Sequence, residues 1–265
     1  MYSPVKLGLR FIQYYLKASN GKGHGMHSPF VFNFITRVLN DDRQFYCYQR
    51  IEERRRQLLT DNREIFMEDF GAKSVSQPNS TRRVREFARA SLKPPKFGQL
   101  LFRIADYYAP RTILELGTSF GITTAYLASA SKDSTVITME GASQVAAVAT
   151  ENFGKLQLDN ISQVPGNFDH TLPGTLGKLK QVDLAFIDGN HRYEPTMRYF
   201  EDLIALTHED SILIFDDIHW SAEMEKAWNQ IRKDERVTLS IDLFFIGLVF
   251  FRKESRVKQH FTIRF

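Results

Sequence analysis

Short apolar runs alternate with stretches of helical periodicity along the chain from about Val84 onward. The apolar runs predict five strands: RTILELG, TVITMEG, ISQVPGN, VDLAFIDG and SILIFDD. The stretches around them predict helices: Lys96 to Tyr108, SFGITTAYLASA, ASQVAAVATENFGKL, EPTMRYFEDLIAL and SAEMEKAWNQIRKD. Because strands that are apolar throughout are typical of parallel sheets covered by helices on both faces, we expect an α/β fold with a Rossmann-like, doubly wound, mostly parallel sheet.

The last part of the chain departs from this alternation. VTLSIDLFFIGLVFFR holds two β-rich runs with no helix between them, which predicts a C-terminal antiparallel hairpin at the end of the sheet. The first part reads as helical: Ser28 and Pro29 predict the cap and first turn of one helix, and Asp42 to Leu59 predicts another.

A composition change marks the start of the α/β pattern. Phe70 to Arg83 is rich in Gly, Ser, Pro and Asn, so we expect a loop or linker there. We therefore expect a helical extension with its linker over residues 1–83 and the α/β domain over residues 84–265.

Composition narrows the class of protein. The chain has 265 residues, 43% of them hydrophobic and 25% charged, which is typical of a globular protein. Its single cysteine, Cys47, excludes an internal disulfide and favours a cytoplasmic location. No run approaches the ~20 apolar residues that a membrane span requires. The net charge of +4 is spread along the chain, so we expect no nucleic-acid binding.

Two charged segments have simple interpretations. RIEERRRQ (Arg50 to Gln57) mixes both signs and is expected to be a solvated helix face. MYSPVKLGLRFIQYYLKASNGKG is mildly amphipathic and basic and lacks an apolar signal core. We expect this segment to form a helix docked on the protein, with contact to a membrane surface as the alternative.

Each predicted strand ends in polar or small residues. In open parallel sheets, ligands bind at the carboxyl ends of the strands, so these ends form a candidate site. The five ends, in chain order, are Glu115-Leu-Gly117, Glu140, Gly166-Asn167, Asp188 and Asp216-Asp217.

The loop after the first strand, Gly117-Thr-Ser-Phe-Gly121, indicates which cofactor binds. A dinucleotide loop follows G-x-G-x-x-G, but here the middle glycine is missing and Phe120 intrudes. Glu115 stands just before the turn and suits a cationic ligand. Glu140 ends the second strand, where an acidic residue that binds ribose is expected. A purely structural turn is the alternative.

Taken together, ELGTSFGITTAYLA, the acid of VITMEG, FIDGNH and LIFDD resemble the successive motifs of class I S-adenosylmethionine-dependent methyltransferases. The nearest subgroup is similar to the small-molecule O-methyltransferases related to catechol and caffeoyl-CoA O-methyltransferases. The resemblance covers roughly Lys96 to Arg252. It implies that Glu115 and Asp188 line a crevice for the cationic cofactor, and it assigns further contacts to Gly117 and Ser119 (methionine moiety), Glu140 (ribose), and Asn167 and Phe168 (adenine).

The resemblance also raises a metal site. In the metal-dependent members, an Asp after the fourth strand and an Asp-Asn pair after the fifth bind a divalent cation, which here implies Asp188, Asp216 and Asp217 with Mg²⁺ or a similar ion. The second residue of the pair is Asp217 rather than Asn, and His191 stands where a Lys is often found. FIDGNHRYEP also resembles a broader methyltransferase group in which metal use cannot be assumed. The alternative is that Asp188 contacts only the cofactor.

Methyl transfer to a hydroxyl requires removal of the acceptor proton. His191 is the first candidate for the base, and His219 is the second, with metal ligation as its alternative role. Trp220 and Tyr193 are candidates for the wall of an aromatic acceptor pocket.

The leading functional hypothesis is an S-adenosylmethionine-dependent methyltransferase that acts on a hydroxyl of a small molecule. An NAD-dependent oxidoreductase and a non-catalytic cofactor-binding protein of the same fold are the alternatives. In related methyltransferases, added N-terminal helices cover the acceptor or make a dimer contact, so a homodimer is also an expectation.

Overall fold

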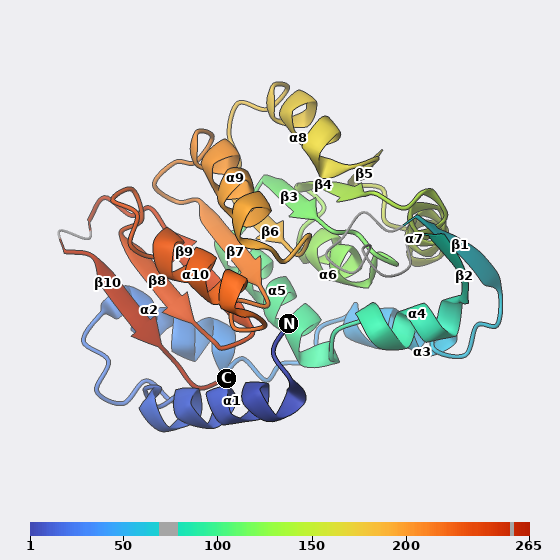
Figure 1. Ribbon diagram of the computed structural model, residues 1–265. Helices are drawn as coiled ribbons and strands as arrows, with labels where there is room; N and C mark the ends of the chain where they lie inside the picture. The colour runs from blue at the N-terminus through green and yellow to red at the C-terminus, as the bar shows by residue number, and fades with distance from the viewer. Residues whose placement is uncertain (69–78, 255–256) are drawn as a thin grey trace. The chain divides into compact units, whose positions relative to one another are not determined.

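Strands and helices alternate through most of the chain (Figure 1). Eight of the strands belong to one mixed sheet. The computed structural model describes residues 1–68, 79–254 and 257–265. The predicted α/β fold with a mostly parallel sheet, a C-terminal antiparallel hairpin and N-terminal helices is confirmed.

Contacts within the chain divide it into two units. The middle unit comprises Asp42–Thr175, and the terminal unit comprises Met1–Asp41 and Leu176–Phe265. The predicted boundary between residues 83 and 84 stays a prediction.

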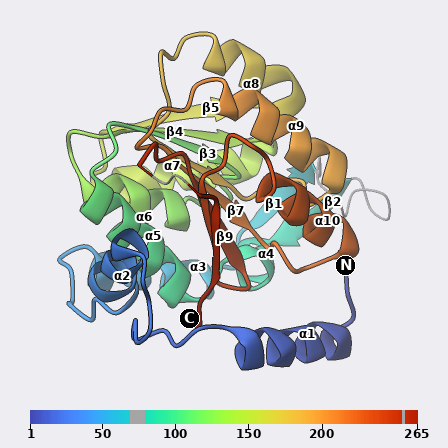
Figure 2. The ribbon, with the colours of Figure 1, turned by 90° about the vertical axis from the view of Figure 1, so that its left-hand side faces the viewer.

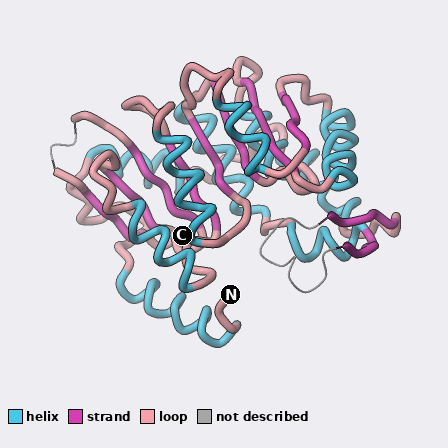
Figure 3. The backbone as a smooth tube through the Cα atoms, turned by 45° about the horizontal axis from the view of Figure 1, so that its top comes forward, coloured by secondary structure: helices cyan, strands magenta, loops and turns pink. Residues whose placement is uncertain are grey.

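The middle unit contains three parallel strands in the order β3-β4-β5. Helices and strands follow one another regularly in this part of the chain (Figure 3). The elements are α5 (Pro95–Tyr108), β3 (Thr112–Leu116), α6 (Ile122–Ala130), β4 (Thr135–Glu140), α7 (Ser143–Leu156), β5 (Ile161–Pro165) and α8 (Phe168–Leu176). Helix α8 was not expected, because Pro173 and Gly174 stand inside it and proline disfavours a helix interior.

The start of the middle unit differs from the expectation in two places. Helix α3 (Tyr48–Leu58) begins six residues later than the predicted start at Asp42. In the segment before it, Phe45 packs against Phe102 with ring centroids 4.7 Å apart. Strands β1 (Glu64–Glu68) and β2 (Asn79–Arg83) form an antiparallel pair, so the last five residues of the expected linker are a strand. The rest of that expected linker, residues 70–78, lies outside the described residues. Helix α4 (Val84–Ser91) follows β2 directly.

The charged segment of α3 is solvated on one side only, where Glu53 and Arg56 are exposed as expected. Arg54 and Arg55 are only 7% and 8% exposed. Arg54 donates from Nε to Asn152 Oδ1 at 2.5 Å, and Arg55 pairs with Glu52 at 3.1 Å. The two buried arginines of this segment are therefore paired with polar or acidic side chains, because a buried guanidinium requires such partners.

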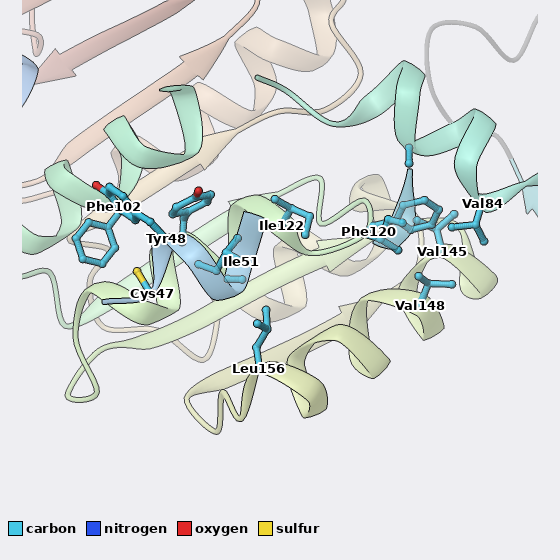
Figure 4. Packing of buried hydrophobic residues seen from close by; sticks show 14 of the residues in the cluster. Cys47, Tyr48, Ile51, Val84, Phe102, Phe120, Ile122, Val145, Val148 and Leu156 are labelled. Atoms are coloured by element: carbon cyan, nitrogen blue, oxygen red, sulfur yellow. The ribbon is translucent and has the colours of Figure 1, made fainter. Parts of the chain in front are cut away.

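An apolar cluster joins α3 to the α6 and α7 helices of the middle unit (Figure 4). Tyr48 packs edge-on against Phe102 and Tyr126, with centroid distances of 5.3 and 5.6 Å. Cys47 lies in the same cluster, and burial raises the pKa of its thiol to about 11. A thiol that stays protonated near neutral pH is a structural group rather than a nucleophile.

The terminal unit contains five strands in the order β10-β8-β9-β7-β6. Strands β6 and β7 run parallel, whereas β9 pairs antiparallel with both β7 and β8, as the hairpin prediction required. Strand β10 pairs parallel with β8 and was not predicted, because its residues QHFT give no apolar run. The elements are β6 (Leu184–Ile187), α9 (Tyr193–Ile204), β7 (Ile212–Asp216), α10 (Ala222–Ile231), β8 (Leu239–Asp242), β9 (Ile246–Phe250) and β10 (Gln259–Thr262).

Three helical segments from the start of the chain complete the terminal unit: α1 (Pro4–Lys17), α2 (Pro29–Phe34) and the π-helix η1 (Ile35–Leu39). Ser28 caps α2 by accepting a hydrogen bond from the Val31 N–H, as its position before Pro29 predicted. In Figures 1 and 2, α9 and α10 lie on one side of the strands of this unit and α2 on the other. No helix in the described part of the chain has the length and hydrophobicity needed to cross a membrane.

Candidate active site

The loop from β3 to α6 is a sharp turn built on left-handed backbone. Gly117, Ser119 and Gly121 have φ values of 106°, 50° and 75°. The N–H groups of Gly117 and Thr118 both donate to Met139 O at 3.0 Å, which fixes the loop beside the end of β4. A non-glycine residue at positive φ is uncommon, so Ser119 is held in a strained conformation by its surroundings.

Glu140 ties this loop to the end of β4. Its carboxylate accepts hydrogen bonds from the Ser119 N–H at 2.8 Å and from the Ala142 N–H at 3.0 Å. The structure therefore brings Glu140, Gly117 and Ser119 together, as a cofactor loop requires. Their assignment to the cofactor stays a prediction.

Glu115 is a fully buried carboxylate at the heart of the same turn. Its Oε2 atom accepts hydrogen bonds from Thr124 Oγ1 at 2.5 Å and Thr138 Oγ1 at 2.6 Å, and Thr118 Oγ1 lies 2.6 Å from Thr138 Oγ1. Sequence reasoning missed these three hydroxyls, although a threonine on the buried face of a strand is a signal for a polar partner. The bonds give Glu115 a role in fixing the loop, and its predicted cofactor contact stays untested.

Phe120 does not intrude into the turn, contrary to the expectation. Its side chain is fully buried and packs edge-on against Phe87, with centroids 4.8 Å apart. Gly121 is needed for packing: a Cβ atom there would lie 2.4 Å from Phe153 Cε1. The buried ring of Phe120 therefore holds the turn against the interior of the middle unit.

The end of β5 lies beside Glu140. The Gly166 N–H donates to Glu140 O at 2.8 Å, and Gly166 has a φ of 124°. Asn167 Oδ1 accepts from the Asp169 N–H at 2.9 Å, which caps α8, and Phe168 is the half-buried first residue of that helix. Asn167 and Phe168, the two residues predicted to contact adenine, thus directly follow a glycine that is bonded to the backbone carbonyl of Glu140.

A second group of polar side chains lies in the terminal unit, where β6 and β7 end. Asp188, His191 and Asp216 each offer one ligand atom, and these atoms all lie within 4.8 Å of one another. Pairing of Ile187 with Phe215 in the parallel strands brings the two aspartates side by side. We call these three residues the acidic cluster.

The acidic cluster differs in one member from the predicted metal set. His191 Nε2 lies 3.3 Å from Asp188 Oδ1, and Asp216 is fully buried. Asp217 is also buried, at 7% exposure, but it is not a member of the cluster, and its φ is 53°.

Backbone strain concentrates at these strand ends. Of the seven non-glycine residues with positive φ in the described ranges, four lie in the loops that follow β3, β6 and β7: Ser119, Asn190, His191 and Asp217. Strained residues of this kind persist where the surrounding structure holds them, often at functional sites. Trp220 stacks on the His191 ring with centroids 5.7 Å apart and planes at 13°, which holds the imidazole in place.

The second candidate base, His219, has other partners. Its Nε2 lies 2.8 Å from Asp242 Oδ2 and its Nδ1 lies 3.3 Å from Glu225 Oε1. Although burial alone lowers the pKa of His219, Asp242 and Glu225 together raise it above the usual value. This pairing favours a structural role for His219.

Tyr193 makes several contacts with α10, and its predicted place in the wall of an acceptor pocket stays a prediction. Its N–H donates to Glu223 Oε2 at 3.0 Å, its hydroxyl donates to Gln230 Oε1, and Lys226 stands 4.0 Å over its ring. These contacts join α9 to α10, so Tyr193 packs two helices together.

Comparison with known proteins shows which family the strands and loops described above are similar to. Residues 114–218 match the family model described as a methyltransferase domain. This part of the chain is therefore similar to a methyltransferase domain. The predicted class of enzyme, an S-adenosylmethionine-dependent methyltransferase, is confirmed. The match favours this class over the oxidoreductase that the glycine loop alone left open.

Several solved methyltransferase structures have a fold similar to that of this chain. The O-methyltransferase of Bacillus cereus in complex with S-adenosylhomocysteine shares 19% identity, with 81% of this chain and 95% of that chain covered and a TM-score of 0.56. The S-adenosylhomocysteine-bound methyltransferase PaMTH1 of Podospora anserina shares 14% identity over 86% and 97% of the chains, with a TM-score of 0.58. TomG of Streptomyces achromogenes, an O-methyltransferase involved in tomaymycin synthesis and solved with S-adenosylmethionine, shares 20% identity over 61% and 82% of the chains, with a TM-score of 0.52. No curated protein sequence matches the chain.

Proposed function

We propose that this methyltransferase transfers a methyl group from S-adenosylmethionine to a hydroxyl oxygen of a small molecule. The observation that carries the proposal is the acidic cluster, because Asp188, His191 and Asp216 gather proton-accepting and metal-binding atoms at two adjacent strand ends. Such groups serve an acceptor whose proton must leave.

The middle unit fits the cofactor. S-adenosylmethionine, when bound, supplies an electrophilic methyl carbon next to a positive sulfur. Gly117 adopts a positive φ of 106° in the turn, and Glu140 is an ionisable carboxylate at the strand end where a ribose is bound in this fold. Glu140 can accept from ribose hydroxyls while it holds the Ser119 N–H, because a carboxylate has about four acceptor sites.

The acidic cluster fits a divalent cation. Two carboxylates so close together repel each other unless a cation joins them. With two oxygen donors and one imidazole, Asp188, Asp216 and His191 suit Mn²⁺ or a similar ion better than the all-oxygen set that Mg²⁺ prefers. Such an ion would lower the pKa of the acceptor hydroxyl and orient it.

His191 has a second role open to it when no ion is bound. Asp188 lies next to its Nε2 atom and Trp220 lies along its ring, so the imidazole is oriented by two neighbours. An oriented neutral imidazole can accept a hydroxyl proton near neutral pH. The two roles differ in how the activity responds to a chelator. If His191 acts as a base without a metal ion, the activity should persist in EDTA.

Calorimetry with S-adenosylhomocysteine tests the cofactor assignment. Glu140→Ala should weaken binding on the order of tenfold to a hundredfold, because hydrogen bonds to a charged acceptor are lost. Glu140→Gln should weaken it less, since an amide oxygen still accepts from the Ser119 N–H, and Glu235→Ala, an exposed change, should leave it unaltered. Equal affinity in all four proteins would remove Glu140 from the site.

The acceptor class is tested with the same proteins. Hydroxylated aromatics such as catechol should gain one methyl group by mass spectrometry, and Asp188→Ala should abolish the product. Cofactor binding with no turnover of any hydroxylated acceptor would contradict O-methylation.

A further inference from the structure

Helix α1 has two apolar faces. One consists of Leu7, Phe11, Tyr14 and Ala18, which pack against the loop between β8 and β9. The Phe11 ring meets Phe244 edge-on at 5.1 Å. This face explains how α1 docks on the terminal unit.

The other face is a row of large aliphatic side chains that point to solvent. Val5, Leu9, Ile12 and Leu16 are 75%, 58%, 55% and 74% exposed. Their spacing of four, three and four residues places them on one side of a helix, roughly opposite to the docked face. We call these four residues the outer stripe. An exposed apolar row of this length marks a surface that meets a partner.

Charge shows what kind of partner fits. Residues 1–40 contain no Asp or Glu, whereas they contain five Lys and Arg residues: Lys6, Arg10, Lys17, Lys22 and Arg37. At 100° per residue, Lys6 and Lys17 lie along one edge of the outer stripe, and both are exposed. Arg10 is engaged by Glu225 at 3.0 Å, so the two lysines supply the positive edge.

We propose that α1 binds an anionic membrane surface, with the outer stripe seated among the acyl chains and Lys6 and Lys17 at the headgroup level. An apolar stripe with a basic edge is the arrangement of helices that lie in the membrane interface. A second copy of this chain fits less well, because two outer stripes in contact would bring lysines together with no acidic residue in either helix to pair with them.

Vesicle co-sedimentation of the full chain tests this proposal. The protein should sediment with vesicles of phosphatidylcholine and phosphatidylglycerol mixed at roughly two to one, and only weakly with phosphatidylcholine alone, because basic residues are attracted to anionic lipid. Added salt should weaken the binding, since it screens that attraction.

Two double variants separate the apolar and the charged contributions. Leu9→Gln with Leu16→Gln should lower the vesicle partition coefficient on the order of tenfold or more, and glutamine keeps the helix propensity. Lys6→Gln with Lys17→Gln should lower it on anionic vesicles only, again on the order of tenfold. Val257→Gln, at a residue 73% exposed outside α1, is the matched control and should bind as wild type.

Urea unfolding confirms that each variant is folded, since all the changed side chains are exposed. Equal partitioning of the Leu9 and Leu16 variant and the wild type would overturn the proposal. So would sedimentation equilibrium that shows a dimer which the same variant dissociates, because the outer stripe would then be covered by a second copy.

Discussion

The glycine loop of the middle unit and the acidic cluster of the terminal unit are held in place by different means. In the loop, Glu140 receives two backbone N–H groups and Glu115 receives two hydroxyls, so the carboxylates serve the shape of the turn. In the acidic cluster, Asp188, His191 and Asp216 face one another, and the carboxylates confront like charge.

This difference suits the glycine loop to ligand binding and the acidic cluster to chemistry. A loop whose carboxylates are already hydrogen-bonded is a preformed cradle, and its geometry changes little when a ligand arrives. A cluster of like charges with a histidine is poised to take up a cation or a proton, because either one relieves the repulsion. The three predictions below test this contrast, from the largest expected effect to the smallest.

Cation binding at the acidic cluster should depend strongly on the charge of Asp216. Asp216→Asn should weaken Mn²⁺ binding on the order of a hundredfold, about 3 kcal/mol, because a charged ligand is replaced by a neutral one. Titration calorimetry measures this, and S-adenosylhomocysteine affinity should stay within about threefold. Asp217→Asn is the matched control outside the cluster and should keep the cation affinity. If Asp217→Asn weakened Mn²⁺ binding as much as Asp216→Asn, the ligand set would be the predicted pair of aspartates after β7.

The glycine loop should instead respond to volume. Gly121→Ala places a Cβ 2.4 Å from Phe153 Cε1 at a φ of 75°, so it should lower the free energy of unfolding by about 2 kcal/mol or more. Gly154→Ala, in α7 with no atom within 4 Å of the new Cβ, should raise it by roughly 0.5–1 kcal/mol. Urea denaturation measures both, and equal effects would mean that the loop is not packed as tightly as the contrast requires.

The terminal unit should also carry a pH dependence that arises at His219. Asp242 and Glu225 raise the pKa of His219, so its contribution to stability is fully present below about pH 6.5 and is lost as pH rises through the raised value. His219→Gln should remove that alkaline loss, on the order of 1 kcal/mol, which is the net worth of one charge-assisted hydrogen bond.

An acidic limb of opposite sign provides the control for that measurement. Burial lowers the pKa of His260 to about 4, so its contribution is present above about pH 6.5 and is lost as pH falls toward 4. Urea curves across pH should show this acidic loss in both the wild type and His219→Gln. An unchanged alkaline limb in the variant would contradict the role given to His219.

Much of the sheet could be predicted because its strands are apolar throughout, as in ILIFD of β7, where every residue is buried. Strands β2 and β10 escaped prediction because their residues, NSTRR and QHFT, are mostly polar or charged, so that pairing with a neighbouring strand rather than an apolar run makes them strands. Helix α8 escaped because Pro173 breaks the local pattern.

The candidate site also has a part that the sequence predicts and a part that it does not. Asp188 and Asp216 could be placed together from strand ends alone, since parallel neighbours end at one edge of a sheet. The membership of His191 depends on a left-handed turn at φ 41° that a sequence does not announce. The partners of His219 come from β8 and α10, whose approach is a tertiary fact.

One residue just before α1 makes contacts that have a practical consequence for anyone who wishes to shorten this chain. The Tyr2 N–H donates to Trp220 O at 2.9 Å, and the Tyr2 hydroxyl donates to Glu225 at 2.9 Å. Trp220 in turn stacks on His191. Trimming the first helix to improve expression or crystal growth would therefore loosen the support of the imidazole, and a truncated enzyme that turns over slowly would report on that support rather than on any loss of substrate contacts.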